Sequence, residues 1–140
     1  MGARILVIED NAPNRNLMSY LITAFGHTPI TAESGISGIE AAEREKPDLI
    51  VCDIQMPGID GYEVARRLKG DPRLEPIPLV AVTAYAMVGD QERVLAAGFD
   101  GYIPKPIVPR AFVGQLETFL HRRRRTGSGR KAPVQPGDGS

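Results

Sequence analysis

Short, continuous runs of apolar residues alternate with longer segments of helical periodicity along most of this chain. The runs at residues 5–8, 49–52 and 78–82 lack any polar alternation, which is typical of strands buried on both faces of a sheet. Shorter strands are predicted at residues 28–31 and 101–103. Apolar residues at helical spacing predict helices at residues 14–25, 34–45, 61–69, 87–97 and 112–125.

This alternation of strand and helix occurs five times. Apolar strands joined by crossover helices indicate a parallel sheet with helices on both faces. Because such crossovers are right-handed, the predicted fold class is α/β, with a doubly wound five-stranded parallel sheet. Gly26 and Gly98 are expected to end the helices that precede them.

The bulk composition fits one domain of this kind. The chain has 140 residues, 42% of them hydrophobic, which is enough for one sizeable core but not for two. Cys52 is the only cysteine, so no disulfide can form within the chain. No apolar run approaches the ~20 residues that a transmembrane helix needs. We therefore predict a cytoplasmic protein without a membrane span.

Charge is distributed unevenly along the chain. The formal net charge is zero, which argues against a dedicated nucleic-acid binder. Residues 1–120 nevertheless carry 11 basic and 16 acidic residues, whereas residues 121–140 carry six basic residues and one acid. We predict a domain at residues 1–125 and a disordered tail at residues 126–140, which has almost nothing to bury.

Four consecutive arginines occupy residues 122–125. They are interpreted first as a solvated helix end, which the helix dipole favours at its C-terminus. Contact with nucleic acid, with an anionic membrane or with an acidic partner is the alternative interpretation.

The polar residues that could carry chemistry follow the ends of the predicted strands. Glu9 and Asp10 follow the first strand, Asp53 the third, Thr83 the fourth and Lys105 the fifth. The carboxyl ends of parallel strands lie at one edge of the sheet, where such folds bind their ligands. These residues, distant in sequence, are therefore expected to converge.

Three carboxylates in one crevice repel each other, so such a cluster needs a cation. Oxygen ligands suit Mg²⁺. A carboxylate placed between Mg²⁺, the Lys105 ammonium and the Thr83 hydroxyl can attack a phosphoryl group and form an acyl phosphate. Each residue alone could be a helix cap, a turn or a solvated side chain, but four polar positions of complementary charge at four strand ends favour the functional interpretation.

These residues resemble the receiver domain of bacterial two-component response regulators. The matching segments are Ile-Glu-Asp-Asn at 8–11, Asp-Ile-Gln-Met-Pro-Gly-Ile-Asp-Gly at 53–61, Val-Thr-Ala at 82–84 and Lys-Pro at 105–106. The resemblance covers residues 3–122 and is strongest to single-domain regulators of the DivK type, although receivers of hybrid kinases share the pattern. It implies the flavodoxin-like, or CheY-like, (βα)5 fold with strand order 2-1-3-4-5.

The resemblance also implies which residues hold the metal. Asp53 would be the phosphoacceptor. Glu9, Asp10, Asp53 and the backbone carbonyl of Gln55 would bind Mg²⁺, with Asp10 as a direct ligand and Glu9 often acting through water. Gln55 also lies at a position that tunes the lifetime of the acyl phosphate in this family.

Phosphoryl binding and switching are implied at four further positions. Thr83, the backbone amide of Ala84 and Lys105 would hold the phosphoryl oxygens. Tyr102 occupies the aromatic switch position of the family and would change rotamer as Thr83 shifts. Tyr85 is bulky enough to shield the phosphoryl group from water, which predicts slow self-dephosphorylation. In this family the peptide bond between residues 105 and 106 is often cis.

A switch of this kind would not be a turnover enzyme. A histidine kinase or a histidine phosphotransfer protein would donate the phosphoryl group, and the face of the fourth helix, fifth strand and fifth helix would change its affinity for a downstream protein. With only a tail after the last helix, no DNA-binding domain is expected, and the chain would be a monomer or a phosphorylation-dependent dimer.

Three alternatives stay open. An aspartyl-phosphate phosphatase usually has a second aspartate two residues after its nucleophile, where this chain has Gln55. A constitutive binding module would never use its phosphate, and a receiver could also be part of a hybrid histidine kinase.

Several remaining residues receive no functional role. His27 and His121 belong to no motif and are interpreted as surface histidines. Cys52 is interpreted as an inert core residue, and the methionines at residues 18, 56 and 87 as packing residues.

Overall fold

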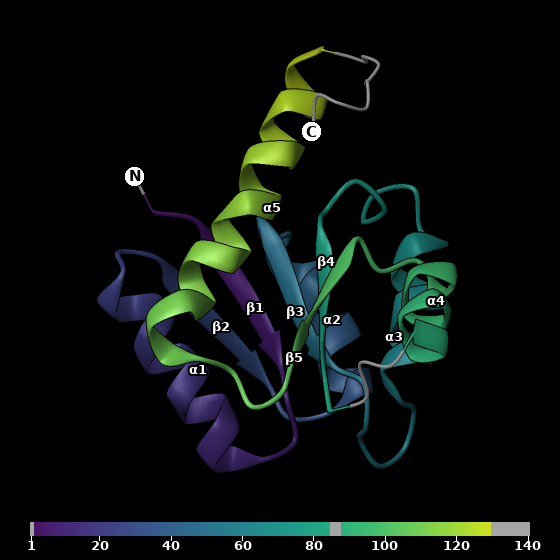
Figure 1. The fold of residues 1–140 in the computed structure, drawn as a ribbon. Coiled ribbons are helices and arrows are strands. Elements are labelled where there is room, and N and C mark those ends of the chain that lie inside the picture. Colours follow the sequence, from purple (N-terminus) through teal and green to yellow (C-terminus); the bar gives the residue numbers. More distant parts are fainter. Residues whose placement is uncertain (1, 85–87, 130–140) are drawn as a thin grey trace.

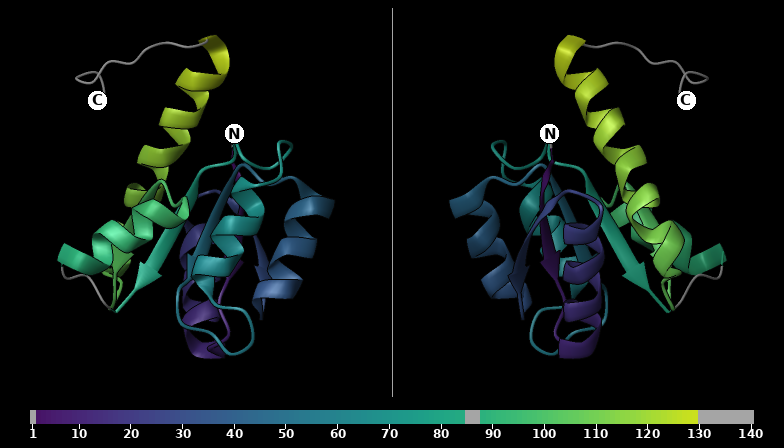
Figure 2. Two further views of the ribbon diagram at one scale, coloured as in Figure 1. Left: turned by 90° about the vertical axis from the view of Figure 1, so that its right-hand side faces the viewer. Right: turned by 90° about the vertical axis from the view of Figure 1, so that its left-hand side faces the viewer.

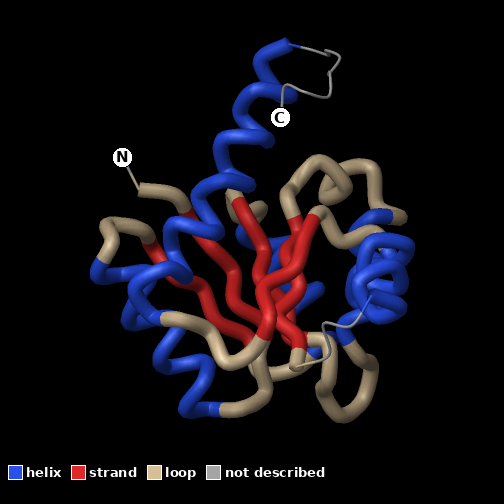
Figure 3. Tube along the Cα trace, in the orientation of Figure 1, coloured by secondary structure: helices blue, strands red, loops and turns tan. Residues whose placement is uncertain are grey.

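The computed structural model describes residues 2–84 and 88–129. In this part of the chain five strands alternate with five helices (Figures 1 and 3). The strands are β1 (Arg4–Ile8), β2 (Thr28–Ala32), β3 (Leu49–Asp53), β4 (Leu79–Thr83) and β5 (Gly101–Pro104). The helices are α1 (Ala12–Ala24), α2 (Gly35–Glu45), α3 (Gly61–Lys69), α4 (Val88–Ala97) and α5 (Pro109–Gly129). None of these helices is both long and apolar enough to cross a bilayer.

The five strands form one parallel sheet with the order β2-β1-β3-β4-β5. The predicted fold class and strand order are therefore confirmed. The register sets Ile8 beside Cys52, so the residues that follow these strands leave the sheet at the same level. Thr83, the last residue of β4, lies beside Pro104 at the end of β5. The polar residues at the ends of β3 and β4 and those just after β1 and β5 consequently share one edge.

Helices cover both faces of the sheet (Figure 2). Helices α1 and α5 pack on one face, over a core that includes Ile5, Val7 and Phe112. Helices α2, α3 and α4 pack on the other face, over a core that includes Leu6 and Ile8. Consecutive residues of β1 thus point to opposite cores, because side chains alternate along a strand. The continuous apolar runs are explained by this burial on both sides.

The predicted packing residues behave as expected where the structure describes them. Met18 is 2% exposed and Met56 is 8% exposed, each within a core. Cys52 is fully buried, and burial raises the pKa of its thiol. Met87 lies outside the described residues, as does Tyr85.

Side-chain caps begin three of the helices. Asn11 accepts a hydrogen bond from the amide of Asn14 at 2.9 Å, and Asp60 accepts one from Glu63 at 3.0 Å. Ser34 and Ser37 form a reciprocal capping box at the start of α2. Gly26 and Gly98 follow α1 and α4 with φ of 90° and 117°, a left-handed conformation that favours glycine, as predicted for these two helix ends.

Helix α5 ends later than predicted. It continues through Gly129, whereas the sequence places the end of the helix at Arg125. Residues 126–129, predicted to be disordered, are therefore helical, and residues 130–140 lie outside the described part of the chain. The prediction rested on the lack of apolar residues to bury in this segment, but extending an existing helix is much easier than starting one.

His27 is not the surface histidine that the sequence predicts. Its side chain is only 11% exposed. The Nδ1 atom accepts a hydrogen bond from the amide of Ala3 at 2.9 Å, and the Nε2 atom lies 2.8 Å from Glu117 Oε2. The ring thereby joins the start of β2 to the segment before β1 and to α5. The side chain of His121 lies outside the description.

Replacing His27 by alanine is expected to lower the free energy of unfolding by about 1–3 kcal/mol, because the amide of Ala3 loses its acceptor in a half-buried place. Urea unfolding measures this change. The matched variant Glu117→Ala removes only the outer contact, at a side chain that is 40% exposed, and should cost about 1 kcal/mol or less. Equal losses from both variants would contradict a role for the Ala3 hydrogen bond.

Candidate functional site

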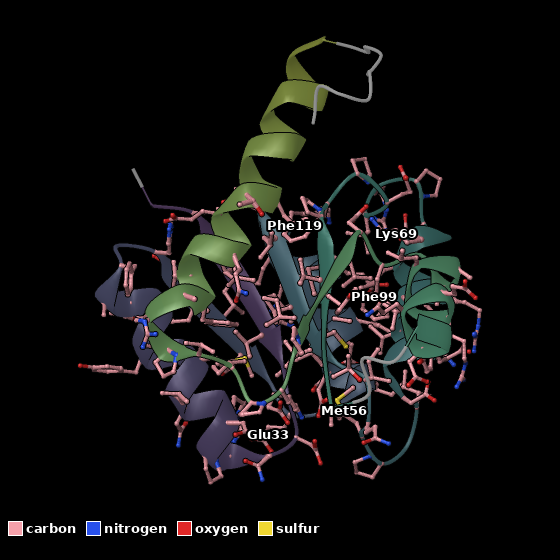
Figure 4. The ribbon with its side chains drawn as sticks, viewed as in Figure 1. Glu33, Met56, Lys69, Phe99 and Phe119 are labelled. Carbon is pink, nitrogen blue, oxygen red and sulfur yellow. The ribbon has the colours of Figure 1, made fainter. Side chains whose placement is uncertain are left out.

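The strand ends carry the acidic and basic residues to one edge of the sheet. In Figure 4, Glu33 and Met56 lie at this end of the molecule, whereas Phe119 lies toward the other end. Carboxylate oxygens of Glu9, Asp10 and Asp53 lie within 4.8 Å of one another. The Lys105 Nζ atom lies 3.1 Å from Asp53 Oδ1 and 3.9 Å from Glu9 Oε1. Four groups from three strand ends thus meet in one crevice.

Main-chain contacts fix the two acids that follow β1. The amide of Glu9 donates to the carbonyl of Ala32 at 3.0 Å, which continues the pairing of β1 with β2. The amide of Asn11 donates to Glu9 Oε2 at 3.1 Å and turns the carboxylate inward. Arg15 Nη1 donates to the carbonyls of Glu9 at 2.9 Å and Asp10 at 3.4 Å. The loop that carries Glu9 and Asp10, called the acid-bearing loop below, is thus fixed by hydrogen bonds with β2 and α1.

Sequence reasoning missed the roles of Asn11 and Arg15. Asn11 could have been recognised as a helix cap, since a proline follows it within the first turn of α1. Arg15 offers no such signal. Its contacts are with backbone carbonyls five and six residues earlier, and these depend on how the loop folds back over the first turn of the helix.

Burial makes the charged form of the Glu9 side chain unfavourable. It is fully buried, and its Oε1 atom accepts no hydrogen bond among the described residues. Burial raises its pKa to about 7, and the neighbouring Asp53 charge adds to this rise, while the Asn11 amide and Lys105 oppose it. A buried carboxylate oxygen without a donor, beside two further carboxylates, fits a site for a hard divalent cation.

The raised pKa of Glu9 predicts an unusual pH dependence of stability in metal-free protein. Between pH 4.5 and about 7 the folded protein keeps a proton that the unfolded chain releases, so stability falls as pH rises through this window. The loss should reach up to roughly 3 kcal/mol above pH 7. Urea unfolding at a series of pH values measures it.

Glu9→Gln is the control for this prediction, because its neutral amide cannot ionise. Unfolding energies of the wild type and the variant should converge at low pH and separate as pH rises, with the wild type losing more. Adding Mg²⁺ at high pH should stabilise the wild type more than the variant, which keeps Asp10 and Asp53 but lacks the Glu9 charge. A constant difference between the two proteins across the window would show that Glu9 titrates normally.

Asp53 ends β3 and is 3% exposed. Its Oδ1 atom accepts a long hydrogen bond from the amide of Gln55 at 3.4 Å and faces Lys105. Gln55 is exposed in the loop that follows. The only carboxylate of β3 therefore opens toward the loops while its base stays within the sheet.

Thr83, Ala84 and Lys105 lie across the crevice from the acid-bearing loop. Thr83 is 2% exposed at the end of β4, and Ala84 follows it on the surface. The amide of Lys105 donates to the carbonyl of Thr83 at 2.8 Å, which ties the lysine segment to the end of β4. The bond between Lys105 and Pro106 is cis, as the family resemblance implies.

Tyr102 lies on β5, close to Thr83 at the end of the neighbouring strand β4. It pairs with Ala81 in the β4–β5 ladder and packs, half-buried, against the core beneath α2, α3 and α4. Thr83 is two residues beyond Ala81, so its side chain points to the same face of the sheet. Tyr102 and Thr83 are thus diagonal neighbours on one face.

An apolar cavity of about 410 Å³ adjoins the site. Leu17 and Met18 of α1 line one wall, and Pro106 and Ile107 line another. Glu9 and Lys105 also contribute to its lining. Leu17 is 37% exposed. An apolar recess therefore lies directly beside the charged groups of the site.

Comparison with known proteins defines the class of this fold and site. Residues 5–117 match the family described as the response regulator receiver domain. The chain belongs to this family, which confirms the predicted resemblance. It is a receiver, not a conventional enzyme.

Among individual relatives, the chain is 41% identical to the polar-differentiation response regulator DivK of Brucella ovis, over 120 residues that cover 86% of this chain and 98% of the relative. The DivK protein of Brucella anthropi is 40% identical over the same shares. The described domain is therefore DivK-like.

Two solved structures illustrate the similarity in three dimensions. The receiver domain of the sensor histidine kinase PA1611 from Pseudomonas aeruginosa is 30% identical, with a TM-score of 0.79 over 86% of this chain and 99% of that chain. That structure has a magnesium ion coordinated in its active-site cleft. A CheY-like receiver from Methanospirillum hungatei, 24% identical with a TM-score of 0.83 over 91% and 100%, shows the shared fold.

Proposed function

We propose that this protein is a single-domain response regulator that accepts a phosphoryl group on Asp53 from a phosphohistidine donor. One observation carries the proposal: the Lys105 ammonium lies 3.1 Å from Asp53 Oδ1 inside a cluster of three carboxylates. If Lys105 were only a solvated side chain, or Asp53 only a cap, the two side chains would have no reason to lie together in this cluster. The similarity to DivK regulators supports the same function.

The chemistry transfers one phosphoryl group. An Asp53 oxygen attacks phosphorus, the new P–O bond forms as the P–N bond to the donor imidazole breaks, and the imidazole nitrogen keeps the electron pair and takes up a proton. Lys105 neutralises charge on the phosphoryl oxygens. The Thr83 hydroxyl and the Ala84 amide are proposed to donate hydrogen bonds to these oxygens.

Mg²⁺ is the proposed cofactor. Asp10, Asp53 and the backbone carbonyl of Gln55 would bind it, with Glu9 acting directly or through water. The fit is supported by the buried Glu9 oxygen, which accepts no hydrogen bond among the described residues, and by the all-oxygen donor set. The magnesium ion in the similar Pseudomonas receiver also supports it. When bound, Mg²⁺ supplies positive charge that offsets the carboxylates and the incoming phosphoryl oxygens.

Phosphorylation is proposed to act as a switch on partner binding. The acyl phosphate would draw Thr83 toward the acceptor and allow Tyr102, its neighbour on the same sheet face, to change rotamer. The face of α4, β5 and α5 would then alter its affinity for a downstream protein. The domain is proposed to comprise residues 1–125 and to act in the cytoplasm, where histidine kinases present their phosphohistidine.

The decisive experiment offers acetyl phosphate and Mg²⁺ to the purified chain. Intact-mass measurement should show one added phosphoryl group, and reductive trapping followed by peptide mapping should place it on Asp53. Omitting Mg²⁺ should prevent the modification. A histidine kinase panel, offered in the same way, would then identify the donor.

Two aspartate variants provide the matched comparison. Asp53→Asn should remain unmodified. Asp60→Asn changes a nearby aspartate that caps α3, and asparagine caps equally well, so this variant should be modified like the wild type. An unmodified wild type would refute the proposal, and many turnovers of a small phosphate ester would indicate a phosphatase instead.

A further inference from the structure

Helix α5 extends past the body of the domain. Leu120 is the last residue whose side chain the structure describes, and it is 8% exposed in the core shared with α1. The helical backbone continues from residue 121 to Gly129. Figures 1 and 2 show these last turns projecting beyond the end of the sheet where the strands begin. We call residues 121–129 the basic arm, because four of them are the arginines at 122–125.

The arm lacks the pattern of a helix that buries an apolar face. Residues 122–125 occupy four consecutive positions, 100° apart, so they are distributed over all sides of the helical backbone and leave no separate apolar side. The remaining residues are histidine, threonine, serine and glycine. A helix that lies in a membrane surface needs an apolar face of leucine or aromatic residues, which this segment does not have. Single-stranded nucleic acid binders use aromatic stacking residues, which are also missing from the arm.

The neighbouring edge of the domain does not extend the positive charge. Several cations there are already paired with acids: Arg4 with Glu45 at 2.5 Å, Lys69 with Asp100 at 3.1 Å and Arg73 with Asp71 at 2.9 Å. On α5 itself, one turn before the arm, Glu117 pairs with His27. Residues 1–120 together carry five more acids than bases.

This distribution of charge favours a short acidic segment over a nucleic-acid duplex as the ligand of the arm. The phosphates of a nucleic-acid duplex repeat every few ångströms over many base pairs, so a duplex favours a longer positive surface than the arm, and the paired cations of the adjoining edge do not extend it. A short acidic segment needs only the length of the arm itself. Arginine also suits carboxylates, because its planar guanidinium can donate two parallel hydrogen bonds to one of them.

We propose that the basic arm is a docking site for a short acidic segment of a partner protein. The site lies at the opposite end of the domain from Asp53, since α5 begins near the phosphorylation edge and runs back past the start of the strands. It therefore adds a contact that does not depend on the proposed phosphorylation. Because the contact is electrostatic, it weakens with rising salt.

The test uses the full chain and three probes: a fluorescent peptide of alternating glutamate and glycine, a short DNA duplex, and phosphatidylcholine vesicles containing phosphatidylglycerol. The arm variant changes Arg122→Gln, Arg123→Gln, Arg124→Gln and Arg125→Gln. The charge-matched control changes four exposed arginines of the body, Arg44→Gln, Arg66→Gln, Arg67→Gln and Arg73→Gln. Fluorescence anisotropy at physiological salt measures peptide binding, and co-sedimentation measures vesicle binding.

The arm variant is expected to bind the acidic peptide at least about tenfold more weakly than the wild type, whereas the control should bind like the wild type. Equal losses in both variants would reduce the effect to net charge and overturn the proposal. Tighter binding of the wild type to the duplex or the vesicles than to the peptide would also overturn it. Phosphorylation of Asp53 by acetyl phosphate should be unchanged in the arm variant. A negative result in the peptide-binding test would therefore leave the proposed phosphorylation of Asp53 unaffected.

Discussion

Replacing Lys105 by methionine is expected to slow phosphorylation of Asp53 by acetyl phosphate by about 10²- to 10³-fold. The Nζ atom lies 3.1 Å from Asp53 Oδ1, so its charge is placed where negative charge gathers on the transferring phosphoryl group. Methionine keeps most of the length of the side chain and removes only the charge and its hydrogen bonds. Single-turnover rates at saturating Mg²⁺, followed by intact-mass measurement, give the fold-change directly.

Lys69→Met is the matched control for this prediction. Lys69 is also a partly buried lysine with an acidic partner, since it contacts Asp100 at 3.1 Å and donates to the carbonyls of Glu75 and Ile77. It lies at the opposite edge of the sheet from Asp53. The control should lose stability but keep its phosphorylation rate, and a near-normal rate in Lys105→Met would refute the proposed role of the ammonium.

The fold could be predicted because its evidence is local. Each buried strand is marked by an apolar run of four or five residues and each helix by apolar residues at helical spacing, with a glycine after α1 and after α4. The strand order came from the resemblance to receivers, since periodicity alone gives no order. The structure agrees with both.

The convergence of the site could be predicted for a topological reason. Once the strands are parallel, their carboxyl ends must share an edge, so Asp53 and Lys105 meet although 52 positions separate them in the sequence. The distances could not be predicted, because they depend on loop conformation. The roles of Thr83, Ala84 and Gln55 remain proposals.

The contacts that escaped prediction are those that join distant elements through one side chain. His27 meets Ala3 and Glu117, which lie 24 and 90 positions away, and no local pattern signals either contact. The sequence shows a histidine after a glycine, which is also how a surface histidine in a turn would look. The same limit applies to Arg15, whose partners are backbone carbonyls.

Adding a single methyl group at Gly61 is expected to have the second large effect, a loss of folding stability. A Cβ atom built on this residue would lie 2.6 Å from the carbonyl oxygen of Asp53 and 2.7 Å from the Cα atom of Ile54. Both contacts are with backbone, which cannot rotate away as a side chain would. Gly61→Ala is therefore expected to push the start of α3 from the end of β3 and to lower the free energy of unfolding by about 1–3 kcal/mol.

The same substitution at Gly114 should have the opposite sign. Gly114 lies within α5, and an added Cβ there would meet nothing within 4 Å. Gly114→Ala should raise the free energy of unfolding by about 0.5–1 kcal/mol, because alanine favours the helix. Urea unfolding of both variants separates the effect of helix propensity from that of close packing. Helix propensity alone predicts a gain in stability at each position. Only close packing against the end of β3 predicts a loss at Gly61, together with slower phosphorylation at the proposed acceptor Asp53. A gain in stability at both positions would show that the end of β3 tolerates the shift.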